Sequence, residues 1–313
     1  MHGARFVTVV FGLVLLSACN LREYAVMKAV NEQANYVPDE AHYGGWDIQK
    51  LSDRVHTFRW GWYRNIVVRT DEGFVVIDPF NRAAATTLKS ELAKIAPGQP
   101  VHTLFYSHYH LDHTVGGGAL APQRVVAHAR CPSYWADLGD TRDAKDVLPP
   151  TELIDGDQEI TIGGVEFRLL YLGRTHTDTL YAYYLPQEKL LFTADLALIR
   201  AVFPLGSPDM YTPGIVKQLD RLAQLDFDTY VPSHFGYGKK RDFLESAEFH
   251  RTVHRLSIET LEKYGLPKTG EEYERGFRAM YDPLKAKYGE YHGFDEEILF
   301  VIGRAFSGAL LGY

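Results

Sequence analysis

The sequence predicts a mixed α/β fold in which two β-sheets pack face to face and helices cover the outer faces. The chain has 313 residues and is 46% hydrophobic, which is enough to bury a large core. Short apolar runs typical of strands gather in two separate halves of the chain, and a segment with helical spacing of apolar residues follows each half. Because a sheet must bury one face against another layer, two such halves predict two stacked sheets.

The first half contains four predicted strands and one helix. The strands are expected at residues 54–59, 64–69, 73–77 and 101–106. Asn81 can cap a helix that runs to Ile95, and Pro97-Gly98 ends that helix. This half therefore supplies one sheet and one covering helix.

The second half repeats this pattern and then becomes helical. Strands are expected at residues 159–162, 165–171, 180–185, 190–193 and 229–231, and Pro213 opens a helix that runs to Leu225. From about residue 241 onward the apolar residues have helical spacing. We therefore expect one domain at 46–240 and a helical C-terminal extension at 241–313.

The N-terminus has the features of an export signal. Arg5 is followed by an apolar stretch at 7–16 that is short for a membrane span, and Leu16-Ser17-Ala18-Cys19 resembles the bacterial lipobox. We expect residues 1–18 to be a lipoprotein signal peptide, Cys19 to carry the lipid and residues 19–45 to form a tether. Asn20 after the cysteine favours the periplasmic side of the outer membrane in the bacterial cell envelope. An ordinary signal peptide would instead leave the protein free in the periplasm.

Charge and cysteine content narrow the choice of partners and of stabilising bonds. The net charge is −7 and no run of basic residues is present, so nucleic acid is not an expected partner. Cys131 is the one cysteine that remains after residue 19, so no internal disulfide can form in the mature chain. We interpret Cys131 as a buried structural thiol.

Four possible metal ligands lie within six consecutive residues: His108, His110, Asp112 and His113. They directly follow the apolar strand predicted at 101–106, so they leave the core at the end of a strand. Imidazole and carboxylate groups are the ligands that zinc and similar cations prefer. A polar surface loop that is rich in histidine is the alternative, and the buried strand before it argues against that alternative.

Three further candidate ligands each follow a predicted strand. His176 follows the strand at 165–171, Asp195 follows the strand at 190–193, and His234 follows the strand at 229–231. Loops of a sheet sandwich gather along its edges, where a rigid scaffold can bring distant side chains together. The repeated pattern predicts that these donors meet the first cluster.

In this order of motifs the chain resembles the metallo-β-lactamase superfamily over roughly residues 46–240. The resemblance implies an αββα sandwich with two zinc ions at one edge. It implies that His108, His110 and His176 hold one ion, that Asp112, His113 and His234 hold the other, and that Asp195 bridges both. Because residue 195 is Asp and not Cys, the ligand set is similar to that of glyoxalase II and lactonases. Ala194 and Ser233 stand where the family often has glycine, and both are small enough to preserve the geometry.

The implied chemistry is hydrolysis. Two zinc ions about 3.5–4 Å apart can hold a hydroxide and polarise the substrate oxygen, and iron or manganese could occupy the same ligands. Asp112 is expected to orient the hydroxide or to move a proton to the leaving group. Asp78 is expected to support a ligand histidine from behind, although a simple turn residue before Pro79 is the alternative.

The expected function is a zinc-dependent hydrolase that cleaves an ester, thioester, lactone or amide-like bond in a small molecule. β-Lactamase activity is one alternative, and Leu198 argues against it because a drug-binding lysine often stands there in the cysteine-containing lactamases. A mononuclear iron sulfur dioxygenase on the same fold is another alternative. A non-catalytic lipoprotein is the third. Trp60 and Trp62, between two early strands, could form a flap over the metals or could belong to the core.

Overall fold

The computed structural model describes residues 44–139, 143–203 and 209–312. The predicted signal peptide, the lipidated Cys19 and nearly all of the tether expected at 19–45 lie outside these ranges. Within them, no helix combines the length and the apolar character that a bilayer span requires. The described residues divide into two compact units: one comprises residues 44–139, 143–200 and 209–248, and the other comprises residues 201–203 and 249–312. The first of these contains both sheets and is called the sandwich unit below.

The first sheet of the sandwich unit has seven strands in chain order. They are β1 Trp46–Lys50, β2 Val55–Trp60, β3 Tyr63–Thr70, β4 Gly73–Ile77, β5 Val101–Phe105, β6 Arg124–His128 and β7 Glu152–Ile154. The pairs β1–β2, β2–β3 and β3–β4 are antiparallel, and the pairs β4–β5, β5–β6 and β6–β7 are parallel. The parallel pairing sends the ends of β4 and β5 to the same edge of the sheet.

The second sheet has six strands in the order β13-β12-β11-β10-β9-β8. They are β8 Gln158–Ile162, β9 Val165–Tyr171, β10 Tyr181–Leu185, β11 Leu190–Thr193, β12 Thr229–Pro232 and β13 Gly238–Lys239. β11 and β12 pair in parallel and the other neighbours are antiparallel.

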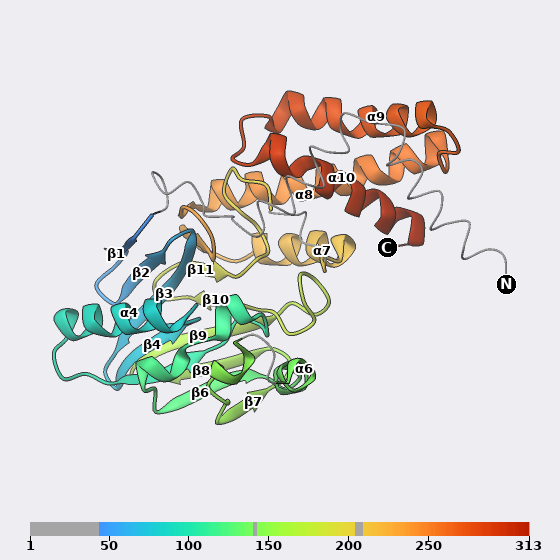
Figure 1. The fold of residues 1–313 in the computed structure, drawn as a ribbon. Coiled ribbons are helices and arrows are strands. Elements are labelled where there is room, and N and C mark those ends of the chain that lie inside the picture. The colour runs from blue at the N-terminus through green and yellow to red at the C-terminus, as the bar shows by residue number, and fades with distance from the viewer. Residues whose placement is uncertain (1–43, 140–142, 204–208, 313) are drawn as a thin grey trace. The chain divides into compact units, whose positions relative to one another are not determined.

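The two sheets lie face to face (Figure 1), and aromatic side chains meet between them. The ring of Phe105 on β5 lies 6.1 Å from that of Phe167 on β9 and 5.5 Å from that of Tyr183 on β10. All three side chains are fully buried or nearly so. Burial of apolar surface is the main favourable contribution to the free energy of folding, at roughly 25 cal/mol per Å² of apolar surface buried.

Helices cover the outer faces of both sheets, which confirms the predicted αββα sandwich. Helix α4 (Arg82–Ile95) is capped by the Asn81 side chain, which accepts a hydrogen bond from the Ala84 amide at 2.9 Å. Its buried face packs on the first sheet in one cluster with Phe74 and Val76. On the second sheet, helix α7 (Thr212–Ala223) buries an apolar stripe, and Phe243 at the start of helix α8 (Lys240–Tyr264) packs edge-on against Tyr230 of β12.

Several short elements of the sandwich unit were not predicted. They are β1, β6, β7, β13, the helix α5 (Leu111–Thr114) and the helix α6 (Cys131–Leu138). Each is too short to show a hydrophobic period, and β7 has only three residues. These short strands form because they pair with a neighbouring strand, and these short helices form because they pack on the sheet. Cys131, which begins α6, is fully buried and unpaired, as expected.

The second unit is mostly helical where the structure describes it. It contains most of α8, with α9 (Gly270–Tyr288) and α10 (Phe294–Leu311). These helices share an apolar core that includes Phe249, Val253, Met280, Leu284 and Ile298. The helical character expected after residue 241 is therefore present.

Candidate metal centre

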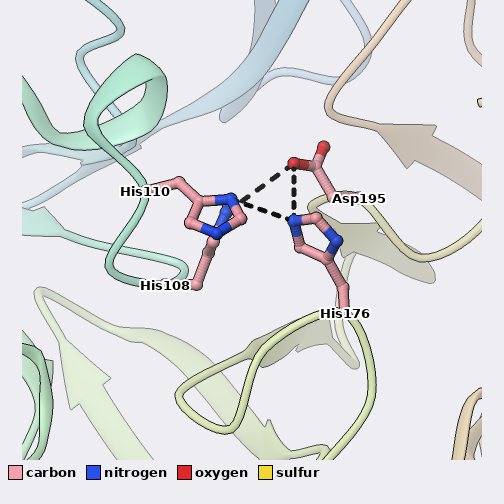
Figure 2. A group of neighbouring side chains, drawn as sticks. All are labelled: His108, His110, His176 and Asp195. Atoms are coloured by element: carbon pink, nitrogen blue, oxygen red, sulfur yellow. Dashed lines mark hydrogen bonds and ion pairs between the residues drawn. The ribbon is translucent and has the colours of Figure 1, made fainter. Parts of the chain in front are cut away.

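The loops that follow four strands bring the predicted ligands together at one edge of the sandwich. The cluster at 108–113 follows β5 of the first sheet, and His176, Asp195 and His234 follow β9, β11 and β12 of the second. Figure 2 shows His108, His110, His176 and Asp195 directed toward one point. One ligand atom from each of these four residues lies within 4.8 Å of the others. We call them the first donor group.

A second donor group shares the same aspartate. It consists of His113, His234 and Asp195, whose ligand atoms also lie within 4.8 Å of one another. His234 Nε2 lies 2.6 Å from Asp195 Oδ1, whereas His176 and His113 approach the other oxygen, Oδ2. The two carboxylate oxygens of Asp195 thus face both groups.

The spacing of the donor atoms suits a small cation. His108, His113 and His176 each place Nε2 between 3.2 and 3.6 Å from Asp195 Oδ2. His110 Nδ1 lies 3.1 Å from His176 Nε2. Nitrogen and oxygen ligands about 2.0–2.2 Å from one tetrahedral zinc ion stand roughly 3.3–3.6 Å apart. The donors therefore already have nearly the separation that such an ion requires.

Two buried ring nitrogens also fit a metal. Nε2 of His108 and Nε2 of His113 are buried and have no hydrogen-bond partner among the described residues, although Asp195 Oδ2 lies 3.6 and 3.3 Å away. Buried polar atoms are almost always hydrogen-bonded, because leaving one unpaired costs about 1–3 kcal/mol. A cation in each donor group would satisfy these nitrogens, His108 in the first group and His113 in the second.

Asp112 lies at the edge of this cluster, outside both donor groups. Its Oδ2 is 3.7 Å from His113 Nε2 and accepts a hydrogen bond from the Tyr63 hydroxyl at 3.3 Å. The side chain is 46% exposed, whereas that of His113 is fully buried. The structure therefore brings six of the seven predicted ligands into close contact and leaves Asp112 beside them, open to solvent.

Asp195 is the electrostatic centre of the site. Burial alone would raise the pKa of its carboxyl, but the charges of His234 and His113 hold that pKa well below its usual value. Burial would likewise lower the pKa of His113, yet Asp195 and Asp112 raise it well above its usual value. The pKa of His176 is also raised, because its contacts with Asp195 outweigh its burial. The cluster thus concentrates positive charge around one carboxylate.

His108 differs from the other histidines of the cluster. Burial and the neighbouring His110 and His113 lower its pKa well below the usual value. This imidazole is therefore neutral at neutral pH and has a free lone pair, which is the form that binds a metal.

Asp78 supports the cluster from inside the core, as its position at the end of β4 suggested. Its fully buried carboxylate lies 3.0 Å from His113 Nδ1 and accepts hydrogen bonds from the amide and hydroxyl of Ser107. The Ser107 hydroxyl in turn lies 2.9 Å from His108 Nδ1. The Asp78 backbone is left-handed (φ 60°), as is that of Asp195 (φ 44°). Strained backbone of this kind is held by surrounding structure and often marks functional sites.

Two residues of the site were not identified from the sequence. Ser233 donates a hydrogen bond to Asp195 Oδ1 at 2.6 Å and accepts one from the Asp195 amide. Its hydroxyl group therefore holds Asp195 in place, whereas the sequence indicated only that a small residue is needed there. Asp209 contacts both His110 and His176. Ser233 immediately precedes a predicted ligand, which could have drawn attention to it, whereas Asp209 has no comparable local pattern.

Aromatic residues lie beside the second donor group. The Trp62 ring is 4.6 Å from that of His234, and the Tyr63 ring is 5.0 Å from it. Trp60, by contrast, packs against the hydrophobic core of the first sheet. The two tryptophans therefore have different surroundings, and Trp62 is the one next to the candidate centre.

The glycine after α5 is required for this loop to pack. Gly116 has φ +83°, and a Cβ added there would collide with the backbone nitrogen of Arg82 at the start of α4. Close approach of two backbones is a common reason for glycine. This close approach fixes the position of the loop that carries the histidine cluster against helix α4.

Comparison with known proteins agrees with this architecture. Residues 64–234 match the family model of the metallo-beta-lactamase superfamily. The chain belongs to that superfamily. The match supports metal binding by this protein, and the cluster of histidines and aspartates supplies donors for it.

Individual relatives place the chain within a varied family. It is 34% identical over 217 residues to the alpha subunit of a 2,4-dinitroanisole O-demethylase from Nocardioides sp. (strain JS1661), covering 68% of this chain and 65% of the subunit. The beta subunit is 26% identical over 264 residues, which is 79% of this chain and 76% of the subunit. A metallo-beta-lactamase structure from Pontibacter korlensis superposes with a TM-score of 0.57 and 23% identity, covering 66% of this chain and 99% of that one. The chain thus spans about two thirds of the alpha subunit.

Proposed function

We propose that the protein is a hydrolase that uses two divalent cations to cleave a small molecule with water. The observation that carries this proposal is the sharing of Asp195 by two donor groups, because a bridging carboxylate is how a protein holds two cations close together. The first donor group would hold one ion. His113, His234 and Asp112 would hold the other with Asp195. Zinc suits this set of imidazole and carboxylate donors, and iron or manganese would also be accommodated.

The cations, when bound, supply Lewis acidity that polarises the substrate and makes water more acidic. Asp112 is placed to receive a proton, since its carboxylate is half exposed beside His113. Tyr63 stays a neutral hydrogen-bond donor, because burial and the nearby Asp112 raise the pKa of its phenol far above the physiological range. Its hydroxyl can orient the Asp112 carboxylate or donate to charge that develops on the substrate.

Two classes of substrate follow from different observations. The ligand set with aspartate at 195 supports carbonyl substrates, namely esters, thioesters, lactones and amides. The relative named as a 2,4-dinitroanisole O-demethylase supports a second class, aryl methyl ethers with electron-withdrawing groups. In that reaction water and the ether would give a phenol and methanol. The aromatic rings of Trp62 and Tyr63 beside the second donor group could stack on such an aryl group.

A one-metal oxygenase is less well supported. A mononuclear iron site would need the first donor group alone, yet His113 and His234 are buried and directed at the same aspartate. We therefore keep iron-dependent sulfur oxidation as the alternative to be tested by metal content. β-Lactam cleavage falls within the same hydrolytic proposal and is tested with it.

Cellular context forms part of the proposal. Lipidation at Cys19 would anchor the enzyme in the bacterial cell envelope. The relatives named as alpha and beta subunits support a second chain of the same fold as a partner. Size-exclusion chromatography with light scattering, and mass spectrometry of the N-terminal peptide, would test these two expectations separately.

The test of the main proposal is a substrate panel on zinc-loaded protein. It should include lactones, thioesters, aryl esters, β-lactams, sulfate esters, phosphodiesters and 2,4-dinitroanisole. We expect turnover of at least one carbonyl substrate or of the aryl ether, abolished by a chelator and restored by zinc. Water labelled with ¹⁸O would show which C–O bond of the ether breaks, because the label appears in either methanol or the phenol. Less than one metal per chain, or oxygen consumption with iron in place of hydrolysis, would overturn the proposal.

A further inference from the structure

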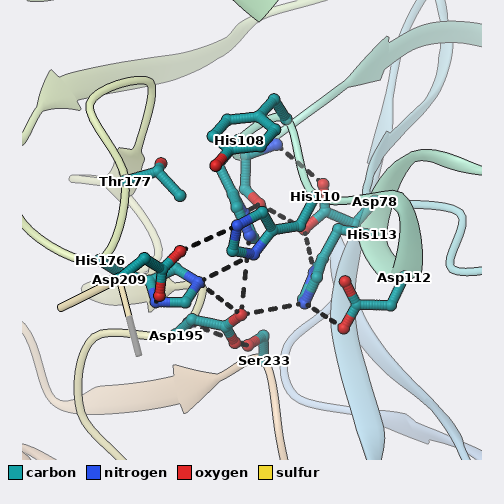
Figure 3. A network of polar contacts seen from close by, with 12 residues as sticks. Asp78, His108, His110, Asp112, His113, His176, Thr177, Asp195, Asp209 and Ser233 are labelled. Carbon is teal, nitrogen blue, oxygen red and sulfur yellow. Dashed lines mark hydrogen bonds and ion pairs between the residues drawn. The ribbon is translucent and has the colours of Figure 1, made fainter. Parts of the chain in front are cut away.

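A carboxylate that is not among the predicted ligands lies behind the first donor group. Asp209 belongs to the sandwich unit and precedes α7. Its Oδ2 is 3.0 Å from His110 Nε2, and its Oδ1 is 3.3 Å from His176 Nδ1 (Figure 3). The longer contact falls short of hydrogen-bond geometry and is electrostatic. One carboxylate thus touches two of the three histidines of the group.

The ring nitrogens that Asp209 touches are the outer ones. His110 directs Nδ1 and His176 directs Nε2 toward each other, 3.1 Å apart, and His176 Nε2 also approaches Asp195. The opposite nitrogen of each ring faces Asp209. Because the two nitrogens of an imidazole point in different directions, Asp209 cannot reach the point where the inner nitrogens converge. It is therefore placed to support ligands rather than to act as one.

We propose that Asp209 is a positioning residue that holds His110 in the ring orientation and tautomer needed to bind the first cation and that also orients the His176 ring through its charge. This inference rests on the proposed function, since it requires a metal at the first donor group. When the outer N–H of an imidazole donates a hydrogen bond to a carboxylate, the proton stays on the outer nitrogen. The inner nitrogen then keeps its lone pair for the metal and becomes more basic. A single carboxylate shared by two rings also fixes their orientation relative to each other.

The proposal separates the two donor groups. Asp78 supports His113 of the second group, and Asp209 contacts only members of the first group among the residues for which a contact is described. Loss of Asp209 should therefore weaken one metal site and leave the other nearly unchanged. Loss of a generally important structural residue would not discriminate between them.

The experiment compares Asp209→Asn and Asp209→Ala with the wild type and with Asp137→Asn, which removes an exposed carboxylate on α6. The purified metal-free proteins are titrated with zinc by calorimetry in competition with a chelator. We expect two zinc ions in every variant, with one affinity lowered about 10–100-fold in both Asp209 variants and the other changed less than threefold. Asp137→Asn should match the wild type. Asp209→Asn keeps the shape of the side chain, so it remains informative if Asp209→Ala folds poorly.

A spectroscopic measurement tests the role of positioning directly. In cobalt-loaded protein, proton NMR detects exchangeable N–H protons of the histidines that bind the metal. We expect the His110 N–H to exchange faster with water in Asp209→Asn than in the wild type, while histidines of the second group keep their exchange rates. Unchanged affinities and unchanged exchange would overturn this inference but not the proposed function. A wild-type protein that binds no metal would overturn the proposed function itself.

Discussion

The two donor groups meet at Asp195, yet they are supported in different ways. In the second group the His113 side chain is fully buried and contacts Asp78, which is itself fully buried at the end of a core strand. In the first group the His110 side chain is 24% exposed and contacts Asp209, which lies in a turn and whose side chain is 33% exposed. A carboxylate in the core links its metal site to the stability of the whole sandwich, whereas a carboxylate at the periphery affects metal binding alone. The contrast suggests that the affinity of the first site can change without loss of the fold.

The shared aspartate provides the most severe test of this picture. Asp195→Ala should reduce bound zinc from about two equivalents to less than one and lower turnover by roughly 10³-fold or more, because both groups lose a ligand. Metal analysis after gel filtration and single-turnover assays would measure this. Asp195→Asn controls for shape. Two tightly bound ions in Asp195→Ala would show that the groups do not depend on a common ligand.

Asp112 should affect the reaction more than metal binding or folding. Asp112→Ala is expected to lower kcat by about 10²–10⁴-fold, since a group that transfers protons typically contributes that much. Its exposed position predicts an unchanged thermal midpoint. Turnover, zinc content and thermal unfolding should be measured on the same preparation, with Asp137→Ala as the control. Full activity in Asp112→Ala would refute the assigned role.

The stability of the metal-free protein should separate the two supporting aspartates. Asp78→Ala is expected to lower the free energy of unfolding by about 3–5 kcal/mol, because buried donors of Ser107 and His113 lose their acceptor. Asp209→Ala should lower it by less than about 1 kcal/mol, since its contacts are partly exposed and screened. Urea denaturation of both variants would measure the difference. Equal losses would contradict the division between core and peripheral support.

The smallest expected effect is a dependence of zinc binding on pH. The pKa of His113 lies well above its usual value, so the metal-free protein carries a proton there at neutral pH that zinc must displace, and the raised pKa of His176 extends proton binding at that ring to higher pH. The affinity should therefore rise with pH, about tenfold per pH unit for each displaced proton. Because the pKa of His113 lies well above its usual value, the filling of the second group should continue to depend on pH up to higher pH than the filling of the first group. Calorimetry in buffers with different ionisation enthalpies counts the protons, and no buffer dependence would contradict this prediction.

Much of the sandwich could be predicted because its signals are local. The strands β4, β9 and β11 have the bounds expected from short apolar runs, and α4 begins after the predicted cap at Asn81. The short strands β6 and β7 were missed, because only their pairing in the sheet makes them strands. The candidate ligands were visible as donors that follow apolar runs. Their coordination of metal remains a prediction.

The sequence by itself determined the fold class, the donor types and the family to which the chain belongs, since these depend on neighbouring residues and on motif order. The tertiary structure alone decided that Ser233 bonds Asp195, that Asp209 faces His110 and His176, and that Trp62 rather than Trp60 lies beside His234. Such contacts join residues tens of positions apart. No periodicity encodes them, because they arise only when two packed sheets bring their loops to a common edge.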